Sequence, residues 1–137
     1  MTLVIDASCG LGFLMPDEKD PVSQAALKAI KASVETWVTA HWALEVANSM
    51  RYAVPSRITE AESAALCAYV LALEAHVHVD TETYRRAFSE TLALAKAHGL
   101  TVYDAAYLEL AMRKGATLAT KDKDLARAAR ACGVAVL

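Results

Sequence analysis

Two spacings of hydrophobic residues divide the chain into short and longer elements. Short apolar runs, typical of buried strands, predict strands at 2–5, 36–39, 77–79, 116–120 and 134–137. Apolar residues three and four positions apart predict helices at about 7–14, 21–33, 41–53, 60–74, 82–97, 103–114 and 123–132. Strands joined by helices run mostly parallel, through right-handed crossovers. The order therefore predicts an α/β fold, a three-layer α/β/α sandwich with a mainly parallel sheet of four to five strands.

The composition is that of a folded protein. The chain has 137 residues, and we expect residues 1–137 to form a single domain. Because 55% of the residues are hydrophobic and 22% are charged, the chain should fold rather than stay disordered. The net charge of -2 carries no basic signature of nucleic-acid binding. That absence is weak evidence, since a clustered acidic site can conceal a mildly basic remainder.

The spacing of the cysteines and the length of the apolar runs indicate the cellular compartment. Cys9, Cys67 and Cys132 form no CxxC pair, which favours a reduced, cytoplasmic compartment. The longest uninterrupted apolar run, residues 64–73, is too short to span a bilayer. We therefore expect no membrane association.

Four carboxylates fall at predicted strand ends and helix starts. Asp6 ends the first strand, Glu45 lies one turn into the helix after the second, Asp104 opens the helix before the fourth, and Asp122 follows the fourth. In open parallel sheets, sites form outside the carboxyl ends of the strands, where the strand order reverses. If the first and fourth strands are neighbours, Asp6 and Asp122 face each other and the other two acids can close the ring.

Each acid also has a purely structural explanation. Asp6 and Asp122 can each cap the helix that follows. Asp104 stands three residues after Thr101, which is capping-box spacing, and Glu45 could belong to a solvated helix face. Four acids at one end of a sheet nevertheless favour a site, because caps could equally be Ser, Thr or Asn.

An acidic cluster constrains its own chemistry. Two carboxylates about 4 Å apart repel by about 4 kcal/mol at an effective dielectric near 20, so the group must protonate or hold a cation. An all-oxygen set suits Mg²⁺ or Mn²⁺, which implies phosphate-ester hydrolysis. The histidines at 41, 76, 78 and 98 show no zinc-ligand spacing, and no phosphate-binding glycine loop is present.

Three segments resemble a known family: "LVIDASCGLGFL", "HWALEVANSM" and "TVYDAAYLELAMRKGATLATKDKDLARAARACGVAVL". They are similar to the PIN-domain ribonucleases, specifically to VapC-type toxins of bacterial toxin–antitoxin pairs. Each acid keeps a local context, namely D-x-S, E-x-x-N, Y-D-x-x-Y and T-x-D. The similarity is weakest over residues 55–98.

The resemblance implies a Mg²⁺-dependent endoribonuclease that inhibits translation. Asp6 and Asp104 would have the principal metal-binding roles, with Glu45 and Asp122 completing the acidic pocket. Supporting polar residues that orient the carboxylates would be Ser8, Asn48 and Thr120. The resemblance also implies a homodimer, a small antitoxin partner, and a transfer RNA or a ribosomal RNA loop as substrate.

Basic residues next to the acids are candidates for holding RNA. Without the four proposed site carboxylates, the net charge of -2 becomes +2. Lys121 and Lys123 flank Asp122, and Arg127 follows one turn later. We expect these three to contact phosphates, which would position RNA without selecting its sequence. The alternative is a solvated helix start.

Two other functions remain open from the residues alone. A receiver-like signalling domain also holds Mg²⁺ with acids at strand ends, and Asp80, directly after the third strand, would be its phosphoacceptor. That design requires an acidic pair after the first strand, whereas Asp6 is flanked by Ile5 and Ala7. The second alternative is a PIN-like module that binds RNA without cutting it.

Overall fold

A computed structural model describes residues 1–15, 17 and 19–137. Its centre is a sheet of four strands, all parallel, in the order β3-β2-β1-β4. The strands are β1 (Thr2–Ile5), β2 (Glu35–Val38), β3 (His78–Val79) and β4 (Thr117–Ala119). The predicted adjacency of the first and fourth strands is confirmed, and the strand order reverses between them.

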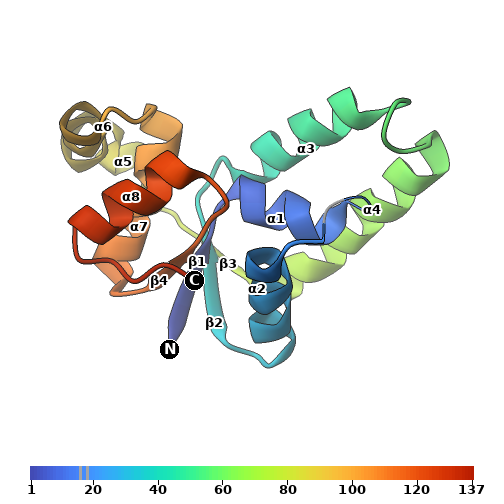
Figure 1. The fold of residues 1–137 in the computed structure, drawn as a ribbon, viewed down its shortest axis with the longest axis horizontal. Helices are drawn as coiled ribbons and strands as arrows, with labels where there is room; N and C mark the ends of the chain where they lie inside the picture. The colour runs from blue at the N-terminus through green and yellow to red at the C-terminus, as the bar shows by residue number, and fades with distance from the viewer. Residues whose placement is uncertain (16, 18) are drawn as a thin grey trace.

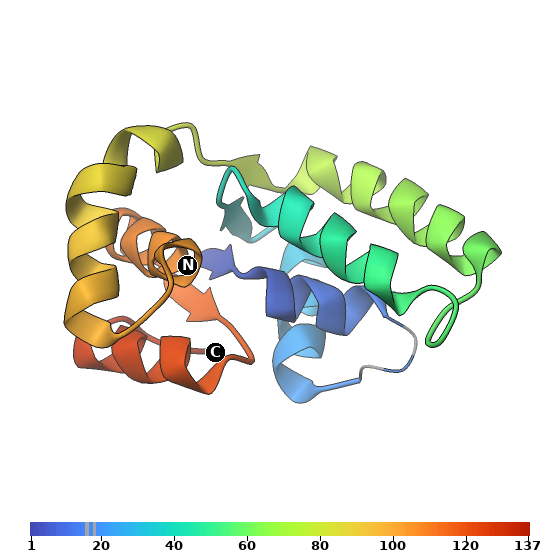
Figure 2. The ribbon, with the colours of Figure 1, turned by 90° about the horizontal axis from the view of Figure 1, so that it is seen from above.

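Helices cover the sheet in two layers (Figures 1 and 2). One layer contains α1 (Ala7–Leu14), α2 (Pro21–Lys31), α3 (Trp42–Ala53) and α4 (Glu60–Leu73). The other contains α5 (Thr83–Arg86), η2 (Ala87–Thr91), α6 (Leu92–His98), α7 (Val102–Lys114) and α8 (Lys123–Ala131), while the short η1 (Glu74–His76) leads into β3. The predicted three-layer α/β/α sandwich is confirmed. Within the described ranges, no helix has both the length and the apolar character of a membrane span.

Two predicted elements differ from the structure. The strand expected at 134–137 is reduced to a single bridge, in which Leu118 pairs with Val136. The helix expected at 82–97 is divided by η2, a π-helical segment. A π-turn bonds residue i to i+5, and a hydrophobic spacing near 3.6 does not distinguish it from an α-helix.

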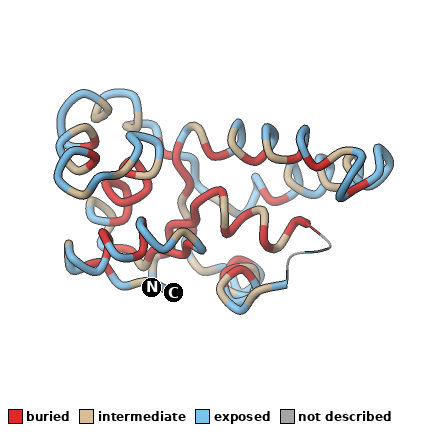
Figure 3. The backbone as a smooth tube through the Cα atoms, turned by 45° about the horizontal axis from the view of Figure 1, so that its top comes forward, coloured by how far each residue is buried: buried red, intermediate tan, exposed pale blue. Residues whose placement is uncertain are grey.

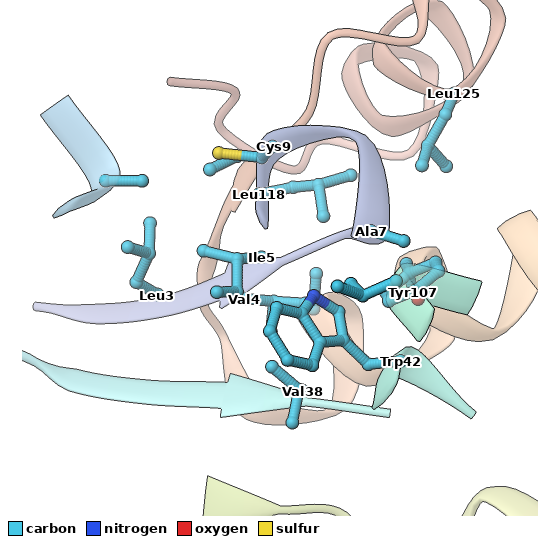
Figure 4. Packing of buried hydrophobic residues seen from close by; sticks show 14 of the residues in the cluster. Leu3, Val4, Ile5, Ala7, Cys9, Val38, Trp42, Tyr107, Leu118 and Leu125 are labelled. Atoms are coloured by element: carbon cyan, nitrogen blue, oxygen red, sulfur yellow. The ribbon is translucent and has the colours of Figure 1, made fainter. Parts of the chain in front are cut away.

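The core forms around β1, whose Leu3, Val4 and Ile5 are fully buried (Figure 4). A central parallel strand is covered on both faces, which explains its continuous apolar sequence. Trp42, at the start of α3, packs in the same cluster, and its indole N–H donates to the carbonyl of Asp6 at 3.1 Å. This bond ties the start of α3 to the end of β1. The exposed surface of α3 and α4 faces away from this centre (Figure 3).

Candidate active site

The four predicted acids lie at helix starts next to the carboxyl edge of the sheet. Asp6 follows β1 directly and caps α1, because its Oδ1 accepts a bond from the backbone N–H of Cys9 at 2.8 Å. Asp122 caps α8 in the same way, accepting from the N–H of Leu125 at 2.9 Å. Glu45 and Asp104 lie in the first turns of α3 and α7.

The capping explanation therefore applies to two of the four acids. Asp6 and Asp122 are caps, whereas the cap of α7 is Thr101, whose hydroxyl accepts a bond from the N–H of Asp104 at 3.1 Å. Glu45 follows His41, which makes no side-chain capping bond. Capping accounts for the position of Asp6 and Asp122 but not for the carboxylates of Glu45 and Asp104.

Ser8 and Thr120 fix the carboxylate of Asp6. The Ser8 hydroxyl lies 2.7 Å from Oδ1 and 2.9 Å from Oδ2 and donates to the carboxylate. The Thr120 hydroxyl donates to Oδ2 and accepts from the backbone N–H of Asp122 at 3.0 Å. Thr120 thereby joins Asp6 to Asp122 across the β1–β4 boundary. Both residues lie where supporting roles were expected.

The acids influence one another electrostatically. Burial raises the pKa of Asp6 despite the opposing bonds from Thr120, Cys9 and Ser8, and the negative charge of Asp104 raises it further. Burial also raises the pKa of Asp104, and the charges of Asp122 and Glu45 add to the effect. Asp104 therefore interacts electrostatically with each of the other three acids, and these four carboxylates form the candidate acidic pocket, where a cation would relieve the repulsion on Asp104.

Two residues that the sequence analysis did not assign to the site hold Glu45. Tyr107 donates its hydroxyl to Oε1 at 3.2 Å, and burial raises the pKa of this tyrosine, so it remains a donor. His41 places Nε2 at 2.9 Å from the same oxygen and 3.2 Å from the carbonyl of Tyr103. Both oxygens are acceptors, so the tautomer with the proton on Nε2 satisfies these two contacts, and the Thr39 hydroxyl lies 3.5 Å from the same nitrogen.

The sequence did contain a signal for each of these residues. Tyr107 is three positions after Asp104 and His41 is four positions before Glu45, so each shares a helix face with a site acid. Helix periodicity alone did not reveal that α3 and α7 meet at these faces.

The side chains of the other predicted site residues are exposed or pair with acids outside the pocket. Asn48 is exposed and makes no side-chain hydrogen bond within the described part of the chain. Lys121 places Nζ 3.4 Å from a carboxylate oxygen of Asp20, while Lys123 is exposed at the start of α8. Arg127 pairs with Asp124 at 2.9 Å, one turn away on its own helix.

Asp80 lies in an ion pair rather than in an accessible position. Its side chain is 3% exposed, and its two oxygens accept bonds from Arg113 at 3.1 and 3.0 Å. Burial opposes ionisation, but the bonds from Arg113 and Thr83 lower the pKa of Asp80 overall. A carboxylate held in this way is poorly placed to accept a phosphoryl group.

The donor chemistry of the pocket fits Mg²⁺ or Mn²⁺. Within residues 1–15, 17 and 19–137, no three His, Cys, Asp or Glu side chains are arranged as a ready-made metal site. Mg²⁺ does not require one, because it is usually bound by one or two carboxylates together with water and substrate phosphates. Asp6, whose carboxylate orientation is fixed by Ser8 and Thr120, and Asp104, which interacts with the other three acids, are the residues that could hold such an ion.

Comparisons with known proteins bear on the family and the fold. The family model of the PIN domain matches residues 3–131. The chain is 34% identical to Ribonuclease VapC3 of Pyrobaculum aerophilum over 131 residues, which cover 92% of this chain and 93% of that protein. The crystal structure of PAE2754 from Pyrobaculum aerophilum superposes with a TM-score of 0.71 at 21% identity, covering 99% of this chain and 89% of that one.

A further structural neighbour is VapC20 of Mycobacterium tuberculosis, described as a sarcin-ricin loop cleaving toxin. Its TM-score is 0.62 at 17% identity, over 92% of this chain and 94% of that one. These two structural likenesses show the fold, whereas the family match and the 34% identity extend over nearly the whole sequence. The chain therefore belongs to the PIN-domain family.

Proposed function

We propose that this protein is a Mg²⁺-dependent endoribonuclease, with Mn²⁺ as a possible substitute, and the toxin of a toxin–antitoxin pair. The observation that carries the proposal is the placement of Asp6, Glu45, Asp104 and Asp122 at four helix starts next to the carboxyl edge of the sheet. Electrostatics support it, because Asp104 raises the pKa of Asp6, and Asp122 and Glu45 raise the pKa of Asp104. It is supported by the relation to Ribonuclease VapC3. Asp6 is buried and Asp104 is partly buried, so ionising both without a cation is costly, which gives a metal ion a physical role here.

Each residue of the pocket has a defined part in this proposal. Asp6 and Asp104 would be the principal ligands, and Glu45 and Asp122 would complete the site. When bound, the metal supplies Lewis-acid activation of the scissile phosphate and of the attacking water. Ser8 and Thr120 keep the Asp6 carboxylate in one orientation.

Glu45 would be oriented by partners of its own. Tyr107 and His41 both donate to its Oε1, which limits rotation of the carboxylate. Bonds of this kind matter because the partners of a metal ligand fix its orientation and basicity.

The proposed substrate is RNA with an accessible phosphodiester. Single-stranded loops can present a splayed backbone to a pocket, which paired helices cannot. We propose a transfer RNA or a ribosomal RNA loop as the target, with inhibition of translation as the consequence. A small cognate antitoxin, a homodimeric assembly and a cytoplasmic location complete the proposal.

The test is RNA cleavage by the purified protein with Mg²⁺, with Mn²⁺ and with EDTA. Cleavage should need the metal, and Asp104→Asn should reduce it by orders of magnitude. The matched control is Asp124→Asn, which removes an equal charge from an exposed position on α8 and should cleave normally. Undiminished cleavage in EDTA would refute the metal-dependent mechanism, and metal-independent RNA binding with no cleavage would favour a PIN-like binding module. Sequencing the 5′ ends of the products would identify the bond.

A further inference from the structure

We propose that a basic hollow beside the acidic pocket binds phosphates of the RNA strand next to the cleaved bond, and that Arg130 is one of its contacts. The basic hollow is the depression lined by Asp20, Thr120, Lys121, Asp122, Lys123 and Arg130, and its volume is about 420 Å³. The inference rests on the proposed ribonuclease function and adds the path by which the strand leaves the pocket.

The basic hollow adjoins the acidic pocket through two shared residues. Thr120 and Asp122 belong to both, since Thr120 bonds to the Asp6 carboxylate and Asp122 raises the pKa of Asp104. It lies where α2 and α8 begin, on either side of the last residues of the chain (Figures 1 and 2). A strand whose scissile phosphate occupies the pocket would therefore have its neighbouring phosphate at this depression.

Close packing of α1 against α2 brings Asp20 to this position. A Cβ atom at Gly12 would lie 1.9 Å from the Ser23 hydroxyl and 2.6 Å from an Asp20 carboxylate oxygen, so the two helices meet with no space for a side chain. Asp20 caps α2 and pairs with Lys121 at 3.4 Å. This contact holds the Lys121 side chain at the rim.

The phase of α8 decides which of its cations face the basic hollow. Lys123 and Arg130 are seven residues apart, two turns along one face, and Ala126 lies between them on the same lining. Arg127 is 70% exposed and pairs with Asp124 instead. The structure therefore assigns the third phosphate contact to Arg130, in place of the Arg127 that the sequence suggested.

The lining fits phosphates better than bases. It presents three cations against two carboxylates, Asp20 and Asp122, and the described residues that form it include no aromatic ring on which a base could stack. The starts of α2 and α8 are each capped by a carboxylate, so the phosphate contacts fall to the three cationic side chains. Contacts of this kind hold the backbone of any sequence.

Two arginines of α8 provide a matched test. RNA binding is measured over a salt series at constant Mg²⁺ in the Asp104→Asn background, so that the RNA stays intact. Arg130→Ala should reduce the slope of log affinity against log salt by about 0.7, the value for one phosphate contact on a single strand. Arg127→Ala should leave the slope unchanged. Equal melting temperatures would show that both variants fold.

The outcomes separate this inference from the proposed function. Equal slopes for the two variants overturn the role of the basic hollow, even where the parent protein cleaves RNA. A selective loss in Arg130→Ala supports it, even where no cleavage is found and the proposed nuclease activity fails. A parent protein that binds no RNA overturns both. With Asp104 restored, Arg130→Ala should cleave more slowly at low RNA concentration and cut the same bond.

Discussion

Replacing Tyr107 with phenylalanine tests whether Glu45 is held for metal binding. Tyr107 is completely buried, and its ring packs in the core beside β1 (Figure 4). Tyr107→Phe keeps the ring and removes only the hydroxyl that donates to Glu45 Oε1 at 3.2 Å. The substitution therefore separates the hydrogen bond from the packing.

The expected loss of stability is moderate. A hydrogen bond to a charged group contributes about 1.5–3 kcal/mol. Glu45 is 34% exposed and keeps His41 at 2.9 Å, so its carboxylate remains partly hydrated and paired. We therefore expect a loss near the lower limit, about 1–1.5 kcal/mol.

Tyr107→Phe should also weaken metal binding. Residues that orient a metal ligand typically change metal affinity or activity by about 10–100-fold when they are replaced. Since Glu45 would keep one of its two donors, a decrease of about 10-fold in Mn²⁺ affinity is expected. Urea unfolding in EDTA measures the stability, and calorimetric titration measures Mn²⁺ binding.

Tyr103→Phe is the matched control for this substitution. Tyr103 lies four residues earlier on α7, is 66% exposed, and contacts His41 through its carbonyl and its ring. Losing its hydroxyl should change stability by less than about 0.5 kcal/mol. If Tyr107→Phe lowers stability but leaves Mn²⁺ affinity unchanged, Glu45 is not a metal ligand. If it changes neither, the hydrogen bond to Glu45 is not formed in solution.

Two further predictions concern charge. In EDTA at neutral pH, Asp104→Asn should stabilise the protein by up to about 1 kcal/mol, because it relieves repulsion from Asp122 and Glu45. Thermal unfolding measures this stability, and an unchanged melting temperature would mean that the carboxylates are too far apart to repel one another. The pKa of Asp104 is raised in the folded protein, so above about pH 4 this carboxyl binds protons more readily in the folded apo-protein than in the unfolded chain. The gain in stability from Asp104→Asn should therefore disappear as pH falls through the folded-state pKa and Asp104 becomes neutral. Arg113→Met should cost about 3 kcal/mol in urea unfolding, since it takes the guanidinium from the buried acids Asp80 and Glu109. Asp80 keeps the Thr83 hydroxyl and Glu109 keeps Arg86 at 3.6 Å, which limits the cost. The exposed Arg85→Met should cost little. The pKa of Asp80 is lowered, so the stability of this pair should be present above about pH 4 and lost as pH falls through the folded pKa.

Much of the fold followed from the hydrophobic spacing. The continuous apolar run of β1 indicated a strand covered on both faces, and the acid after it indicated the carboxyl edge of the sheet. The strand predicted at 134–137 is only a single bridge in the structure. Apolar residues at a sheet edge pair only where the neighbouring strand is long enough, and β4 spans three residues.

The part of the site that could not be predicted depends on contacts between distant segments. His41 and Tyr107 hold one carboxylate from two helices, and nothing in either local sequence specifies that those helices meet there. Arg130 and Arg127 are equivalent in sequence terms, since both follow Asp122 on one amphipathic helix. Only the position of α2 shows which of them faces a hollow.

Capping and metal binding do not compete for Asp6 and Asp122, although the sequence presented them as alternatives. A capping bond occupies one of the about four lone-pair sites of a carboxylate and holds the side chain in one rotamer. At Asp6 the capping N–H and the hydroxyls of Ser8 and Thr120 occupy three of these sites, which leaves one for a cation. The positive end of the helix dipole partly offsets the repulsion between neighbouring acids. Two carboxylates can therefore stand close together in the folded apo-protein because each is anchored at a helix start. Asp104 is only half-buried and is not itself a cap, so it depends most on a cation for the relief of its charge.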